Sequence, residues 1–175
     1  MLVPVAGDIT QEEIEKSVKA NECAINVTDP GLWNIKNINT VDYWIRIGPT
    51  LCQNHNCNLS NSRRVYARAR GGEVTRYLSK IVFKRELRNG ECMKREWLLY
   101  SPPQSCLYCF ACRLLSKKEW TFATSGFNYW KHSNLIVEHE NGIEHLKCMT
   151  AYLIRHKETV IVDSLLIKLR AGVLA

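Results

Sequence analysis

The sequence contains no apolar run near the ~20 residues that a membrane-spanning helix needs, so we expect no membrane span. Its first residues lack the basic segment and long apolar stretch of a secretory signal, and this absence predicts an intracellular protein. Thiols stay reduced in the cytosol and the nucleus. The eight cysteines of the 175-residue chain are therefore expected to be free thiols or metal ligands, not a disulfide framework.

Groups suited to catalysis are also scarce. The chain has only four aspartates, at positions 8, 29, 42 and 163, and it contains no Ser-His-Asp order, no Walker-type glycine loop and no HExxH helix. We therefore expect a protein that is not an enzyme. The composition, with 46% apolar residues, is sufficient to build the core of one ordinary domain or of a small domain with flanks.

Positive charge is concentrated in one part of the chain. The formal net charge is +7, yet residues 61–95 alone hold eleven Lys or Arg against three Glu, a local charge of +8. This basic segment predicts contact with a polyanion, because each phosphate that Lys or Arg neutralises releases condensed counterions. A solvated face with no partner is the alternative interpretation.

Two cysteines and two histidines have the spacing of a zinc site. Cys109 and Cys112 are separated by two residues, and 26 residues then precede His139, which lies six positions before His145. A Cys-x2-Cys turn presents both sulfurs to one point, and two nearby imidazoles complete a tetrahedral shell. Because protein ligands would take all four positions, the pattern predicts a structural Zn2+ and not a catalytic one.

Other cysteines leave the ligand set open. Cys106 lies three residues before the first of these cysteines, and Cys148 lies three residues after the second histidine, so either thiol is an alternative ligand. A separate group of Cys52, His55 and Cys57 offers a three-ligand site within an Asn-rich loop. A thioredoxin-type redox pair is disfavoured, because no βαβ unit surrounds the Cys-x2-Cys motif.

The pattern of elements predicts an α+β fold. We expect a small zinc-stabilised finger in which a β-hairpin carries the two cysteines and helices carry the two histidines, plus a loosely organised N-terminal extension. The expected strands are residues 41–47, 96–100 and 106–110. The expected helices are residues 8–20, a helix that begins near residue 63 and is divided at the adjacent glycines 71 and 72, residues 127–134, and a longer helix that begins after Asn141.

Five stretches together resemble one known module. They are residues 88–91 (RNGE), 95–101 (REWLLYS), 109–114 (CFACRL), 126–131 (GFNYWK) and 139–145 (HENGIEH). They are similar to the TTF-type zinc finger of hAT-superfamily transposases and of host proteins derived from them, including zinc finger MYM-type proteins. The resemblance covers residues 63–152, and it implies a zinc-dependent, nuclear DNA-binding module in a truncated chain that lacks the catalytic domain. Gly142 departs from the family pattern, in which serine is common at this position.

These observations divide the chain into an N-terminal extension with one short helix (1–62), the basic segment with the finger (63–157) and a C-terminal tail (158–175). The expected cofactor is Zn2+ and the expected partner is DNA, preferred over RNA through the resemblance. The alternative is a protein-interaction module that docks a partner through the aromatics Trp120, Phe122, Phe127 and Trp130. The candidate phosphate-binding residues are Arg63, Arg64, Arg68, Arg70, Arg76, Lys80, Lys84 and Arg85, with Lys117, Lys118 and Lys131 as a second set.

Overall fold

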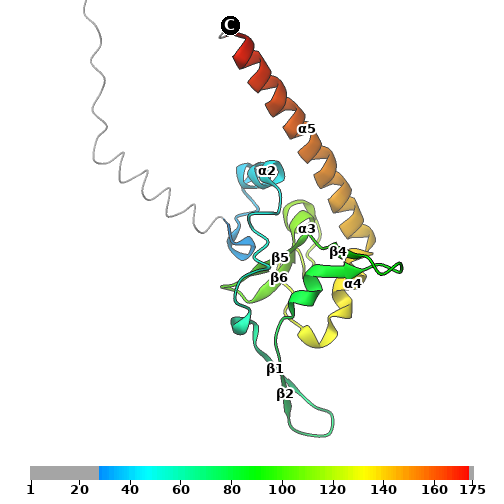
Figure 1. Cartoon of the computed structure of the whole chain (residues 1–175). Helices are drawn as coiled ribbons and strands as arrows, with labels where there is room; N and C mark the ends of the chain where they lie inside the picture. The colour runs from blue at the N-terminus through cyan, green and yellow to red at the C-terminus, as the bar shows by residue number, and fades with distance from the viewer. Residues whose placement is uncertain (1–27, 174–175) are drawn as a thin grey trace, which may run out of the picture.

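The computed structural model describes residues 28–173, which fold into three two-stranded antiparallel sheets and several helices (Figure 1). This arrangement confirms the predicted α+β class. The helix expected at residues 8–20 lies outside the described residues. No helix in the described part of the chain has the length and apolar character needed to cross a membrane.

A hairpin with two completely buried strands forms the centre of the fold. Strand β5 (Leu98–Ser101) pairs with β6 (Cys106–Cys109), and α3 (Phe110–Leu115) follows directly. Every residue of both strands is buried, because the helices and the Trp33-bearing segment cover the hairpin. The predicted hairpin that carries the Cys-x2-Cys motif is therefore confirmed.

Helices after this hairpin carry the histidines. The 3-10 helix η4 (Trp130–His132) leads into α4 (Asn134–Glu140), and α5 (Ile143–Val173) then packs on α3 and α2 before it extends away from the body (Figure 1). The long helix after Asn141 is confirmed. The helix expected at 127–134 is replaced by η4 and α4, so that His139 lies in the last turn of a helix.

The strand predicted at residues 41–47 is wrong, since this segment lies within helix α2 (Ile38–Ile47). The Asn37 side chain caps the helix by accepting a hydrogen bond from the backbone N–H of Asn39 at 2.9 Å. The buried residues Val41, Trp44 and Ile45 have helical spacing, and they outweigh the strand propensity of the segment.

Two buried polar residues fasten residues 29–33 to the finger. After the 3-10 helix η1 (Pro30–Leu32), Trp33 stacks on Trp44 with ring centroids 4.7 Å apart. Arg113 donates to the backbone carbonyls of Pro30 at 2.8 Å and of Ala123 at 2.8 Å. Asp29 accepts a hydrogen bond from the Ser101 hydroxyl at 2.6 Å. Residues 29–33 of the N-terminal extension are thus part of the same core.

The basic segment forms two hairpins, and the helix predicted to begin near residue 63 is wrong. After the 3-10 helix η2 (Ser60–Ser62), β1 (Arg64–Ala67) pairs with β2 (Glu73–Arg76). After η3 (Lys80–Phe83), β3 (Lys84–Glu86) pairs with β4 (Cys92–Lys94). Gly71 and Gly72 have φ of +85° and +83°, values that glycine tolerates and that reverse the chain. Asn89 and Gly90 form the turn between β3 and β4, where Gly90 has a φ of +83°.

Candidate metal centre

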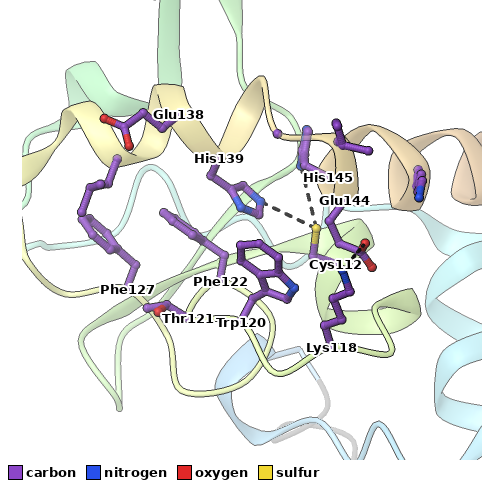
Figure 2. A pocket seen from close by; sticks show the side chains of 14 residues that line it. Cys112, Lys118, Trp120, Thr121, Phe122, Phe127, Glu138, His139, Glu144 and His145 are labelled. Atoms are coloured by element: carbon purple, nitrogen blue, oxygen red, sulfur yellow. Dashed lines mark hydrogen bonds and ion pairs between the residues drawn. The ribbon is translucent and has the colours of Figure 1, made fainter.

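Four elements bring the predicted ligands to one point. Cys109 ends β6, Cys112 lies in α3, His139 lies in the last turn of α4, and His145 lies in the first turn of α5. One ligand atom from each side chain lies within 4.8 Å of all the others. Figure 2 shows both imidazoles directed at the Cys112 sulfur. Among residues 28–173 this is the only such group of three or more His, Cys, Asp or Glu side chains.

The donor set and its spacing fit zinc. Sulfur at about 2.3 Å and nitrogen at about 2.0–2.1 Å from a tetrahedral Zn2+ place the ligand atoms about 3.5 Å apart. The Cys109 Sγ to His145 Nδ1 distance is 3.3 Å, and Cys112 Sγ lies 3.7 Å from His139 Nε2 and 3.9 Å from His145 Nδ1. Two sulfurs and two nitrogens would close the coordination shell, as in structural zinc sites.

Aromatic rings hold both imidazoles in place. Phe122 stacks on His139 with ring centroids 4.3 Å apart and an interplanar angle of 26°. The Trp97 and His145 rings pack edge to face, with ring centroids 4.7 Å apart. Both cysteines and His145 are buried, and His139 is half-buried. These ring contacts fix the orientation of both rings toward the cysteines.

The pKa values of two ligands determine how zinc binding depends on protons. Burial, together with the nearby His145, lowers the pKa of His139 from 6.5 to about 4, so this imidazole is neutral at pH 7 and able to coordinate a metal. A hydrogen bond to Cys109 and burial raise the pKa of Cys112. Without a metal the buried thiol keeps its proton, and zinc binding must displace that proton.

We expect zinc affinity to fall steeply on acidification. Near neutral pH two thiol protons leave when zinc binds, so the affinity should change by about 100-fold per pH unit. His139 adds to the effect below pH 6.5. There the unfolded chain binds a proton that the folded chain does not bind until about pH 4, so folding stability decreases as the pH is lowered from 6.5 to about 4. Competition with a chromogenic chelator at pH 6 and pH 7 measures the slope, and a change below threefold would contradict thiolate ligation.

The two alternative cysteines do not join the group. Cys106 donates from its thiol to the Gln104 carbonyl at 3.1 Å and lies at the far end of β6. Cys148 is buried one turn after His145, where burial and the neighbouring Cys112 raise the pKa of its thiol to about 12. Neither sulfur belongs to the set of ligand atoms that lie within reach of one metal ion.

The separate group of Cys52, His55 and Cys57 forms no metal-binding cluster in the described residues. Cys52 is buried and its thiol donates to the Pro49 carbonyl at 3.2 Å. The His55 ring lies 6.2 Å from that of Phe83. These side chains contribute to packing, and the alternative of a second site in this loop finds no support among the described residues.

A buried ion pair lies beside the metal ligands and was not predicted from the sequence. Arg95 donates through Nε and Nη2 to Oε2 of Glu140 at 3.1 and 3.0 Å. The indole of Trp97 donates to the other carboxylate oxygen at 3.3 Å. Because Glu140 directly follows His139, this pair fixes the helix that carries a metal ligand. The only sequence signal was an acidic residue between the two histidines.

The predicted phosphate-binding residues lie on two hairpins and the segment between them. Arg64 and Arg85 are half-buried: Arg64 donates to the Ser105 carbonyl at 3.0 Å, and Arg85 lies 3.6 Å from the Glu140 carboxylate. The others are exposed and make no ion pair among residues 28–173, and these are Arg63, Arg68, Arg70, Arg76, Lys80 and Lys84. The second set of Lys117, Lys118 and Lys131 is exposed as well.

Three of the four aromatics proposed as an exposed docking surface are buried. Phe122 and Phe127 stack on each other at 4.9 Å, and the Trp130 indole donates to the Ser62 carbonyl at 2.6 Å. Trp120 alone of the four is exposed, at 46%. These rings belong mainly to the core, because they cover the metal ligands and the base of the β1–β2 hairpin.

Comparison with known proteins identifies distant relatives. The chain is similar to zinc finger MYM-type protein 5 of Macaca fascicularis (29% identity over 151 residues), of Homo sapiens (28% over 151) and of Mus musculus (26% over 149). Each match covers 83% of this chain and 21% of the relative, so the chain spans about a fifth of the length of these proteins. No protein-family model and no solved structure matches the sequence. Together with the Cys2His2 cluster, this similarity supports a relation to the MYM-type zinc finger proteins.

Proposed function

We propose that the chain is a zinc-dependent, non-catalytic DNA-binding module of a transposase-derived nuclear protein. In this proposal Cys109, Cys112, His139 and His145 are the zinc ligands, and residues 63–157 are the finger, flanked by residues 1–62 and 158–175. The observation that carries the proposal is the position of the Cys2His2 cluster in a fold whose neighbouring hairpins display unpaired basic side chains. The resemblance to the TTF-type finger supports DNA as the partner.

The contacts of the metal centre support a coupling between zinc and the basic surface. Arg95, which pairs with Glu140 beside the ligand His139, also donates to the backbone carbonyls of Val82 at 2.9 Å and Lys84 at 2.5 Å. These carbonyls belong to η3 and β3, which lead into the second basic hairpin. The position of that hairpin therefore depends on the helix that zinc holds.

We expect binding to duplex DNA with a steep salt dependence. If the six exposed arginines and lysines each neutralise one phosphate, affinity falls about 1000-fold between 50 and 200 mM salt, because that many counterions are released. Fluorescence anisotropy of a labelled duplex, titrated with the zinc-loaded chain over a range of salt concentrations, measures the slope. Binding that remains undetectable at low ionic strength would contradict the proposal.

A protein-interaction module is the second candidate, and one pocket favours it. A cavity of about 600 Å³ adjoins the metal centre and is lined by apolar and charged residues (Figure 2). Exposed Trp120 and Ile143 stand at this cavity, next to the buried Phe122. If the chain is a protein-interaction module, zinc only stabilises the fold. The anisotropy titration with duplex DNA should then detect no complex at any salt concentration. The unpaired charge on the hairpins leads us to prefer DNA.

A further inference from the structure

We infer that the β1–β2 hairpin enters the major groove of duplex DNA as a two-stranded ribbon, with Arg68 and Arg70 at its tip. This inference rests on the proposed function and adds which element meets the DNA and how. Two-stranded ribbons are an established way to read the major groove, which is wide enough to admit them.

The hairpin projects from the body of the protein and is anchored only at its base (Figure 1). The Tyr66 hydroxyl accepts a hydrogen bond from the Trp130 backbone at 2.8 Å and donates to the Asn128 carbonyl at 3.3 Å. Beyond this anchor, residues 67–73 are all exposed. The ribbon is thus held firmly at one end and free to enter a groove at the other.

The dimensions of the ribbon match the major groove. From Tyr66 the first arm of the ribbon continues to Arg68, about 7 Å at the usual rise of a strand, and the turn at residues 69–71 carries it further toward the groove depth of about 8.5 Å. Paired strands lie about 4.8 Å apart, and with side chains they fit a groove about 12 Å wide but not a minor groove about 6 Å wide.

The charge of the hairpin favours an anionic partner. Residues 63–76 hold five arginines and one glutamate, a charge of +4 on fourteen residues. Arg64 lies directly opposite Arg76 in the register of the sheet, a pairing of like charges that costs stability. No arginine of the hairpin makes an ion pair within the described chain. DNA phosphates and the acceptor edges of guanine would compensate this charge.

The tip of the hairpin is a compact turn that can approach the DNA closely. The N–H of Arg68 donates to the Gly72 carbonyl at 3.0 Å and that of Gly71 to the Arg68 carbonyl at 3.1 Å, so the loop is a defined turn. A Cβ added to either Gly71 or Gly72 would meet no atom within 4 Å. The tip also exposes no large apolar side chain, which disfavours a hydrophobic protein surface as its partner.

Two variants of equal charge test the inference. Arg68→Ala with Arg70→Ala removes the tip arginines, and Arg88→Ala with Lys94→Ala removes two exposed charges from the β3–β4 hairpin. The probes are one fluorescent duplex with ordinary cytosine and one with glucosylated 5-hydroxymethylcytosine, which fills the major groove and leaves the phosphates unchanged. Zinc content and circular dichroism establish that each variant is folded.

We expect the glucosylated duplex to bind the unaltered chain about tenfold or more weakly than the plain duplex, because base edges in the major groove are blocked. The tip variant should bind the plain duplex about tenfold or more weakly and no longer distinguish the two duplexes, whereas the β3–β4 variant should still distinguish them. Equal binding of both duplexes by the unaltered chain, or a tip variant that behaves like the β3–β4 variant, would overturn the inference alone. Absence of binding by the unaltered chain to either duplex would overturn the proposed function as well.

Discussion

Replacing Cys109 with serine, or removing zinc with a chelator, unfolds the region from Trp97 to Tyr152. Zinc binding contributes on the order of 10 kcal/mol to the folding of small finger peptides, which is comparable to the net stability of a whole domain. The ligands lie on β6, α3, α4 and α5, so loss of the metal separates elements that enclose the central hairpin. Circular dichroism and tryptophan fluorescence measure the loss of structure.

The matched control is Cys92→Ser. Cys92 is an exposed thiol on β4, outside the metal cluster, so its replacement should leave zinc content and unfolding unchanged. A chain that keeps its tertiary fluorescence after complete chelation, or in which both serine variants behave alike, would show that zinc does not hold the fold.

Replacing Arg95 with alanine should lower the free energy of unfolding of the zinc-loaded chain by about 3–5 kcal/mol, because it removes the only buried cation of the Glu140 carboxylate and leaves the partly exposed Arg85 as its remaining partner. The Arg95 and Glu140 side chains are more than nine-tenths buried, with exposed fractions of 7% and 9%. The substitution also frees the Val82 and Lys84 carbonyls. Urea unfolding monitored by fluorescence measures the change.

An exposed ion pair provides the comparison. Lys118 lies 3.8 Å from Glu144 with 66% of its side chain exposed, so Lys118→Ala should cost less than about 1 kcal/mol. Replacing Arg95 and Glu140 together, with methionine and leucine, should restore much of the stability that the single substitution loses, because no unpaired buried charge remains. A cost below about 1 kcal/mol for Arg95→Ala would show that the buried pair does not fix α4.

Local sequence patterns predicted the site because its ligands follow fixed rules of spacing. Cys109 and Cys112 form a turn at the end of a strand, and His145 lies just after a helix start, so both positions can be read from neighbouring residues. The central hairpin was predictable for the same reason. The pair of Arg95 and Glu140 was not, since 45 residues separate the two and no local pattern links them.

Two of the corrected secondary-structure predictions concern short segments in which helical and strand periods compete. In α2 the spacing of Val41, Trp44 and Ile45 is helical, although the β-branched and aromatic residues favour a strand. In the basic segment, the sequence predicts a helix that is divided at Gly71 and Gly72. Such a glycine pair is equally a hairpin turn, and the structure uses it as one.

X-ray absorption at the zinc edge of the purified chain tests the central claim most directly. We predict one zinc per chain with two sulfurs at about 2.3 Å and two nitrogens at about 2.0–2.1 Å. That result would match the arrangement of Cys109, Cys112, His139 and His145. A chain that holds no stoichiometric zinc, or a zinc shell made mainly of oxygen, would contradict the account.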